Sequence, residues 1–399
     1  MIFPRFPVPD NALGVGPTRS WTSVGKWAGR LKMSHEMADD IPMKIRLYSL
    51  VVLLTSAVNA GAAERYEAYN GIRGLGMGGA AIATVNDETA LMINPAALGK
   101  LRDYFVTLVD PELDIGAETE QITGTKIMDV TDPQKTLDLT LTNPGRRLHT
   151  RAQVFPSIVV PNFGFGVFAK NEVNAEYNDQ DETFTYHYRK DFAAVLGVNF
   201  RLFNGIIKLG ANARATNRTE IMRDDLDPTS TDLDYKELAS EGLGVGSDAG
   251  VIITAPIAYL PMLAAVYRDV GATSYDLRDG MLMKTEERPV TTKGTLDAAI
   301  ALHPIVGKRF RSTWTAELRD VMTDDKEETL MRRLHGGFEF NYADALFVRG
   351  GMNQGYWTAG LELAIVNYQF QAASYGEEIG VESEKREDRR YVVKFAFRF

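Results

Sequence analysis

The sequence predicts an all-β fold: a transmembrane antiparallel β-barrel of about 14 strands with a small N-terminal plug inside its lumen. The last nine residues alternate between an apolar face and a face that carries cations. Segments of strand character follow one another from about residue 105 onward, and their connections alternate between long and short. These observations describe a wall with lipid on one side and water on the other.

The terminal strand, residues 391–399, shows the pattern most clearly. Its lumen-compatible face carries Lys394 and Arg398 between small or apolar residues. Its opposite face consists of Tyr391, Val393, Phe395, Phe397 and Phe399. A chain that ends on such a strand with a terminal Phe resembles bacterial outer-membrane β-barrels. The resemblance implies outer-membrane lipid and the barrel-assembly machinery as partners, and it implies a membrane-insertion signal made of Tyr391, Phe395, Phe397 and Phe399.

Average composition hides this pattern. The 399 residues are 24% charged and 45% hydrophobic, and the mean hydropathy is −0.18. Half of every barrel strand is polar, so the average cannot decide between a soluble protein and a barrel. The net charge of −9 argues against nucleic acid as a partner. The chain has no cysteine, which excludes disulfides, thiol catalysis, Cys-ligated zinc and a lipid-modified Cys.

Residues 43–62 have the three parts of a secretory signal peptide. Met43-Lys44-Ile45-Arg46 precedes the apolar run 47–58, and small residues from Ala60 to Ala63 mark the expected cleavage region. The run is shorter than the roughly 20 residues of a spanning helix, and a buried helix of a cytosolic protein is the alternative. We therefore expect export to the bacterial outer membrane, a disordered leader at 1–42 that precedes the true start at Met43, a plug at 63–100 and a barrel at 101–399.

Alternation and connection length support the barrel along the whole chain. In the stretch 191–202 every second residue is apolar, and the opposite face is too polar for the dry core of a sandwich. Asn204-Gly205 between two alternating runs is a strong hairpin signal, because both residues tolerate positive φ. The predicted long connections are 111–150, 175–182, 220–240, 277–290, 322–331 and 376–388. The predicted short ones are 161–162, 204–205, 256–261, 304–308 and 341–345.

One segment competes with this interpretation. Residues 249–267 contain no charge for nineteen residues and could form a transmembrane helix by length. Pro256 and Pro261 each cost about 3 kcal/mol inside a helix, and the β-branched cluster at 251–254 favours a strand. We expect a hairpin that turns between the two prolines.

The glycine-rich segment 70–100 follows the cleavage region. Residues 74–79 match the dinucleotide fingerprint, but no strand precedes them and no βαβ unit follows. The segment instead resembles the N-terminal plug of the FadL-like outer-membrane proteins, which include long-chain fatty acid transporters and PorV-type barrels. The matching residues are Gly71, Arg73, Leu75, Gly76, Met77, Gly78, Gly79 and Ala80, then Asp87, Ala90, Asn94, Pro95 and Ala96.

A physical reason for a plug accompanies the resemblance. Barrels of eight strands are filled by side chains, whereas sixteen strands leave an aqueous channel, so a barrel of intermediate size needs something to close it. Small residues allow a compact coil in the lumen, and a flexible periplasmic tail is the alternative. Asn94-Pro95 would form a turn, or the cap and first residue of a final helical turn. The residues expected to plug and gate are Gly71, Arg73, Gly74, Gly76, Met77, Gly78, Gly79, Asp87, Asn94, Pro95 and Ala96.

The sequence offers little catalytic or metal chemistry. The histidines of the processed chain are not spaced for metal binding, and the acidic loop with Asp224, Asp225 and Asp227 lacks a calcium-loop pattern. His303 falls on the inward face together with Asp297, but a lone lumen histidine is more often a satisfied polar residue than a base. We expect no enzyme, no metal and no cofactor.

The resemblance implies passive transport of hydrophobic compounds, such as long-chain fatty acids, across the outer membrane. The solute would enter an apolar pocket, and movement of the plug would open a route onward, including a route sideways through the wall. PorV-type relatives are accessory or scaffold barrels of protein secretion and surface assembly. A scaffold of this kind, with secretion-system proteins as partners and no transport, is the alternative function.

Overall fold

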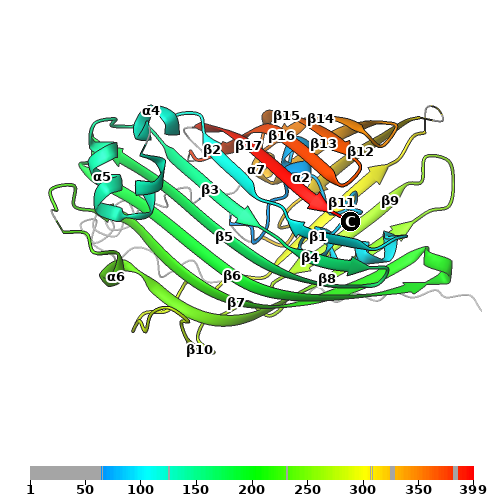
Figure 1. Ribbon diagram of the computed structural model, residues 1–399, viewed down its shortest axis with the longest axis horizontal. Helices are drawn as coiled ribbons and strands as arrows, with labels where there is room; N and C mark the ends of the chain where they lie inside the picture. The colour runs from blue at the N-terminus through cyan, green and yellow to red at the C-terminus, as the bar shows by residue number, and fades with distance from the viewer. Residues whose placement is uncertain are drawn as a thin grey trace, which may run out of the picture. The chain divides into compact units, whose positions relative to one another are not determined.

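The computed structural model describes residue 64 and residues 66–399, except 125, 231, 306, 308, 324–328 and 381–384 (Figure 1). The predicted leader at 1–42 and signal peptide at 43–62 lie outside the described residues. The described residues belong to one compact unit, 61–399. Among them, every helix is too short or too polar to cross a membrane.

Strands dominate the structure. They are β1 (Phe105–Val109), β2 (Glu112–Gly116), β3 (Leu148–Val154), β4 (Ser157–Val160), β5 (Phe163–Asn178), β6 (Thr183–Leu202), β7 (Ile207–Leu226), β8 (Ser240–Thr254), β9 (Met262–Arg268), β10 (Arg278–Asp279), β11 (Thr295–Leu302), β12 (Phe310–Leu318), β13 (Leu334–Tyr342), β14 (Leu346–Asn353), β15 (Tyr356–Ile365), β16 (Tyr368–Glu378) and β17 (Glu387–Arg398).

The wall is a closed antiparallel barrel of 14 strands. β1 and β2 are two halves of one strand interrupted at Pro111, because both pair with β17. β3 and β4 are two halves of the next strand, interrupted at Pro156, and both pair with β5. Proline has no N–H to donate to a ladder, so each break is expected at these positions. β10 is a short segment in a loop beside β8. The predicted fold class and strand number are confirmed.

Side chains alternate across the wall as the sequence predicts. On β6, Phe192 and Phe200 are 47% and 68% exposed on the outer face, whereas Asp191 and Asn199 are buried on the inner face. On β17, Tyr391 points outward while Lys394 and Arg398 point inward and form ion pairs. Outward apolar residues would contact lipid, and inward polar residues find partners within the barrel.

The two rims of the barrel differ as predicted, but some long connections are shorter than predicted, because β2 lies within 111–150 and β7 continues to Leu226. Asn204 and Gly205 adopt positive φ at a tight turn, η3 (Phe203–Gly205), and β8 and β9 form the expected hairpin between Pro256 and Pro261. The long connection predicted at 175–182 is wrong, because β5 and β6 stay paired to Asn178 and Thr183. These strands exceed the 9–11 residues that cross a membrane, so the polar segment continues as a protruding hairpin.

Helical segments in the long connections pack against this protruding part. The connection between β2 and β3 contains α4 (Thr119–Thr123), η2 (Ile127–Thr131) and α5 (Pro133–Leu141). Leu137 of α5 is fully buried with Tyr186 of β6 in a small core of its own. Two further short helices, α6 (Tyr235–Leu238) and α7 (Leu330–Arg333), lie in other long connections. The long-connection rim therefore carries a structured platform outside the wall.

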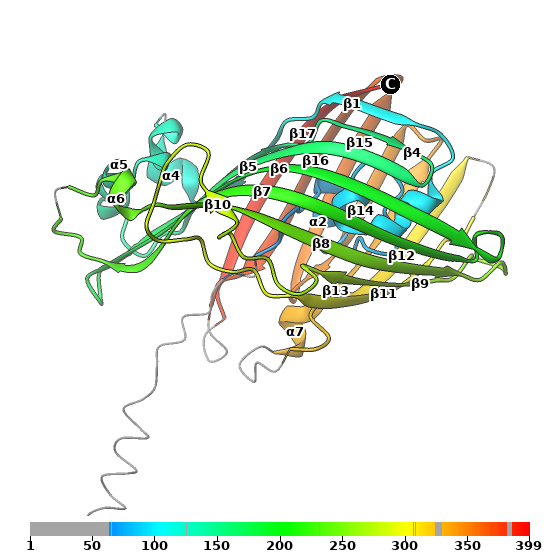
Figure 2. The ribbon, with the colours of Figure 1, turned by 90° about the horizontal axis from the view of Figure 1, so that it is seen from below.

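Three short helices lie inside the ring of strands: α2 (Ile72–Gly76), α3 (Ala90–Ile93) and η1 (Pro95–Lys100) (Figure 2). The Asn94 side chain accepts a hydrogen bond from Ala96 N, and Pro95 occupies the first position of η1. Of the two alternatives for Asn94-Pro95, the structure shows the cap and first helical residue. Residues 66–101 thus lie within the barrel, and we call them the lumen segment.

Candidate functional site

The glycine run of the lumen segment lies directly on backbone of the wall. Gly78 has φ +70°, and a Cβ on it would lie 2.3 Å from Gly336 O and 2.5 Å from Met352 O. A Cβ on Gly337 would lie 2.2 Å from Met77 O, and one on Gly360 would lie 3.1 Å from Gly76 Cα. Glycines on both surfaces are therefore required for this approach. We call this contact with β13, β14 and β15 the glycine seam.

The second motif of the lumen segment meets glycines on the opposite part of the wall. A Cβ on Gly210 of β7 would lie 2.2 Å from Pro95 C, and one on Gly250 of β8 would lie 2.1 Å from Asn94 Oδ1. Asn94 Nδ2 also donates to Ile82 O at 2.8 Å. Asn94 is fully buried, so its amide must be satisfied inside the protein. The two motifs therefore hold the lumen segment between opposite sides of the barrel.

Charged side chains also anchor the lumen segment to the wall. Arg73 makes a two-fold contact with Glu339 of β13, with Nε at 2.9 Å and Nη2 at 2.8 Å from the two carboxylate oxygens. Asp87 lies 3.5 Å from Arg73, and Glu88 lies 3.4 Å from Arg398 of β17. A bidentate arginine–carboxylate pair fixes both position and orientation. These ion pairs oppose movement of the lumen segment.

The start of the lumen segment is held separately. Tyr66 donates a hydrogen bond to Asp191 Oδ2 at 2.7 Å, and its ring lies 4.5, 4.0 and 4.5 Å from the cationic groups of Lys170, Arg189 and Arg218. Contacts of cations with an aromatic face are favourable, most of all away from water. Glu64 forms two hydrogen bonds with Arg390 of β17. Tyr66 of the lumen segment and Glu64, which precedes the segment, are therefore both tied to the wall.

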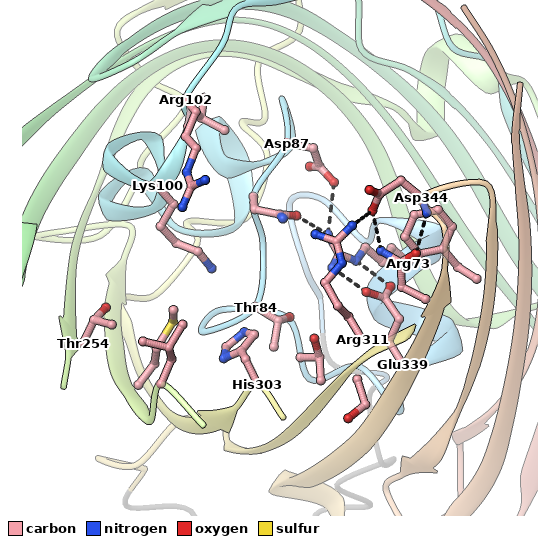
Figure 3. Close-up of a pocket in the computed structure, with 18 of the residues that line it drawn as sticks. Arg73, Thr84, Asp87, Lys100, Arg102, Thr254, His303, Arg311, Glu339 and Asp344 are labelled. Carbon is pink, nitrogen blue, oxygen red and sulfur yellow. Dashed lines mark hydrogen bonds and ion pairs between the residues drawn. The ribbon is translucent and has the colours of Figure 1, made fainter. Parts of the chain in front are cut away.

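A cavity of about 1200 Å³ opens between the lumen segment and the short-turn rim, and we call it the vestibule. Figure 3 shows Lys100 and Arg102 on one side of it and the ion-paired Arg73 and Glu339 on the other. His303 also lines it. Burial lowers the pKa of His303 to about 4, and nearby Lys100 and Arg73 act in the same direction. His303 is therefore uncharged at neutral pH, and it does not act as a cation of the vestibule.

An apolar groove of about 830 Å³ lies where the first two wall strands are interrupted, and we call it the wall groove. It begins at Pro111 and runs over β2, β3, β5, β6, β15, β16 and β17. Its volume lies within the range of small-molecule sites. The outward-facing apolar residues that line it are Leu113, Val154, Phe192, Leu361, Leu363, Phe370, Val393 and Phe395.

A thin part of the wall separates the groove from the lumen. Gln371 of β16 and Lys394 of β17 are directly paired in register, and both line the groove as well as a small cavity of about 20 Å³ beside the lumen segment. That small cavity shares Arg73, Asp87 and Gln371 with the vestibule. Groove, small cavity and vestibule therefore follow one another from the lipid side of the wall to the short-turn end of the lumen.

The predicted site residues are all described. Those expected to plug and gate lie in the lumen segment: Gly71, Arg73, Gly74, Gly76, Met77, Gly78, Gly79, Asp87, Asn94, Pro95 and Ala96. The predicted insertion residues lie at the outward face of the last strand and its end: Tyr391, Phe395, Phe397 and Phe399. Their roles in gating and insertion stay predictions. The described residues contain no cluster suited to a metal ion.

Sequence reasoning missed three parts of the site: the wall glycines, the groove and the basic side of the vestibule. The basic side of the vestibule could have been found in part from the sequence. A hairpin centred on Asn204-Gly205 pairs Arg201 with Lys208, as the structure shows, and this pairing follows from the turn alone. The groove depends on strands from both ends of the chain, and no local pattern indicates it.

Comparisons with known proteins support the fold. Neither protein-family models nor curated proteins gave a match. Among solved structures, the P. putida toluene transporter TodX matches 84% of this chain and 99% of its own, with a TM-score of 0.50 and 11% identity. The Ralstonia pickettii toluene transporter TbuX matches 82% of this chain and 98% of its own, with a TM-score of 0.47 and 13% identity. A Pseudomonas aeruginosa FadL homologue matches 84% of this chain and 98% of its own, with a TM-score of 0.42 and 12% identity. The chain therefore has the fold of the FadL-like outer-membrane barrels, as its N-terminal motif implied.

Proposed function

We propose that this protein carries hydrophobic compounds, such as long-chain fatty acids, passively across the bacterial outer membrane, to which a cleaved signal peptide directs it. The observation that carries the proposal is the wall groove, an apolar concavity of about 830 Å³, together with the Gln371–Lys394 pair, which lines both this groove and the small cavity beside the lumen segment. An outer face in lipid needs no such concavity for stability. A solute that leaves the acyl chains finds a fitted apolar surface there.

The route follows from the cavities. A solute in the groove lies next to β16 and β17, behind which the small cavity borders Arg73 and Asp87 of the lumen segment. Displacement of this segment would join the small cavity to the vestibule, because both already share those residues. The concentration gradient of the solute then drives the flow.

An uptake assay tests the proposal. Ala372 of β16 lines the groove and is exposed on the outer face, so Ala372→Trp fills the groove without touching the lumen segment. Ala316 of β12 is a matched outward alanine that does not line the groove, and Ala316→Trp is the control. We expect radiolabelled oleate uptake by a transporter-deficient host to be restored by the wild type and the control and reduced at least fivefold by Ala372→Trp. Equal uptake by both tryptophan variants would contradict the groove route.

A PorV-type accessory role is the second candidate, and the platform on the long-connection rim favours it. α4, η2 and α5 form a packed unit on the protruding β5–β6 hairpin, which is a surface that a protein partner could recognise. Deletion of the gene separates the two functions: unchanged oleate uptake with loss of secreted proteins supports the accessory role. The proposal includes no enzymatic activity, and phospholipase and protease assays on the refolded barrel test that part. N-terminal sequencing of the mature protein tests cleavage between Ala60 and Ala63.

A further inference from the structure

The outward face of β6 shows where the lipid-facing part of the wall ends. The pairing of β6 with its neighbours is regular from Lys190 to the end of the strand, so Lys190, Phe192 and Leu202 share one face. Phe192 and Leu202 are both exposed, and they lie about 33 Å apart along the strand and about 25 Å apart in height at a tilt of ~40°. The apolar band of an outer-membrane barrel is about 25 Å tall. Phe192 therefore marks the edge of this band toward the long connections, and the exposed Lys190 lies beyond it.

Two polar side chains occupy the outward face of the next two strands at this edge. Asn217 of β7 is directly paired with Phe192, and Glu241 of β8 shares a face with the exposed Val245. Asn217 Nδ2 donates to Glu241 Oε1 at 2.7 Å. Asn217 is only 6% exposed and Glu241 is fully buried, although both side chains lie on the face away from the lumen. A segment outside the wall therefore covers them.

That segment is the loop of residues 280–283 after β10, which we call the apolar loop. Met281 N donates to Asn217 Oδ1 at 3.0 Å. The next two backbone N–H groups donate to the two carboxylate oxygens of Glu241 at 3.1 and 2.6 Å. A Cβ on Gly280 would lie 2.3 Å from Glu241 Cδ, so the loop backbone lies directly on this carboxylate. Three successive N–H groups of an irregular loop are thus satisfied by side chains of the wall.

The tip of the apolar loop exposes apolar side chains. Met281 and Leu282 are both 68% exposed, and Met281 is bonded to the residue that is paired with Phe192. An exposed apolar pair that continues a lipid-facing surface is typical of an interfacial membrane contact. Irregular backbone enters apolar surroundings only when its polar groups are satisfied, so the bonds to Asn217 and Glu241 are what such a contact requires.

We propose that the apolar loop binds the outer leaflet of the membrane, with Met281 and Leu282 at the boundary between lipid head groups and acyl chains. Asn217 and Glu241 are positioning residues, because they hold the loop backbone at the edge of the apolar band. Met283 packs against the core of the platform, so the contact holds the platform at the membrane surface. Continuity with the lipid-facing wall favours lipid over a protein as the occupant. The inference depends on the lipid contact of the wall and not on the transported solute.

Fluorescence quenching in vesicles tests the proposal. The chain has no cysteine, so Met281→Cys carries a single environment-sensitive nitrobenzofurazan label on the purified full-length barrel. Val245→Cys is the lipid-facing reference, and Asp225→Cys, exposed near the end of β7, is the water reference. In phosphatidylcholine vesicles that contain spin-labelled lipid, we expect the label at position 281 to be quenched at least half as strongly as the label at position 245. The label at position 225 should be quenched at least fivefold less than the label at position 245.

Removal of the anchor tests the role of Glu241. Glu241→Ala frees two N–H groups of the apolar loop and should reduce quenching at position 281 at least threefold, while quenching at position 245 stays unchanged. Glu237→Ala removes an exposed carboxylate of α6 and should change neither signal. Heat-modified mobility on a gel verifies the fold of each variant.

Three results would contradict the inference. Quenching at position 281 no stronger than at position 225 would overturn the insertion of the apolar loop. A label at position 281 that lipid does not quench, but that is shielded from iodide in the water phase, would show a protein contact in place of lipid. Unchanged quenching in Glu241→Ala would refute the positioning role of Glu241.

Discussion

The glycine seam makes a sharp prediction for Gly78→Ala. The new Cβ would lie 2.3 Å from Gly336 O, whereas carbon and oxygen normally approach no closer than about 3.3 Å, so the lumen segment must shift by about 1 Å. The positive φ of +70° adds about 1–2 kcal/mol for any residue with a Cβ. The backbone atoms that the Cβ would meet belong to Gly336 and Met352, which pair in the β13–β14 ladder, so we expect the lumen segment rather than the ladder to shift.

The shift breaks hydrogen bonds that hold the segment closed. Gly78 N donates to Thr358 Oγ1 at 2.9 Å, Thr358 Oγ1 donates to Gly76 O at 3.1 Å, and His335 Nδ1 lies 3.0 Å from Gly78 O. Each of these hydrogen bonds contributes about 1 kcal/mol, so their loss and the backbone strain at positive φ together amount to several kcal/mol. Each 1.4 kcal/mol changes an equilibrium tenfold, so the displaced state should gain at least a hundredfold in population.

Ion conductance in planar bilayers measures this change. We expect Gly78→Ala to show frequent open events and sensitise cells to large antibiotics, while the barrel keeps its heat-modified gel mobility. Gly205→Ala is the matched control, because Gly205 also has positive φ, +84°, but the nearest atom that its Cβ would meet is Arg201 Cδ at 4.0 Å. A closed Gly78→Ala channel, or equal leakage in the control, would refute the argument that contact with the wall keeps the lumen segment in place.

Three further predictions concern charged groups. Arg73→Ala leaves Glu339 without its bidentate partner, so conductance should rise, whereas Arg73→Lys should stay closer to the wild type in the same bilayer measurement. Lys394 and Asp110 form a 3.0 Å ion pair where the barrel closes, and their side chains are only 4% and 1% exposed. Lys394→Ala should lower the free energy of unfolding in urea by about 3–5 kcal/mol, because Asp110 is left buried without its partner. The double variant Lys394→Met with Asp110→Asn should recover much of this lost stability. The folded pKa of Lys100 is about 7, below its unfolded value of about 10.4, so stability should rise with pH between these values. Between pH 7 and pH 10 the melting temperature should rise more for the wild type than for Lys100→Met. An equal rise in the two proteins would exclude the lowered pKa of Lys100.

The sequence predicted the wall well because its signal is local. Alternation with period two needs only neighbouring residues, and Phe192 and Asp191 reveal their faces without knowledge of the strands beside them. Turn chemistry is local as well, so Asn204-Gly205 marked its hairpin. The long connection predicted at 175–182 failed because polar composition cannot distinguish a loop from a hairpin that continues beyond the membrane.

The sequence by itself therefore determined the barrel, its approximate strand number and a segment whose small residues suit it to lie in a lumen. What tertiary structure decided is where that segment lies and which groups face it. His335 and Gly78 meet across 257 positions of the chain, and Gln371 and Lys394 bring the groove to the lumen through strand pairing. The physical reason is that side-chain direction within a strand follows from the chain's own geometry, whereas cavity shape and charge balance are set by groups that only closure of the barrel brings together.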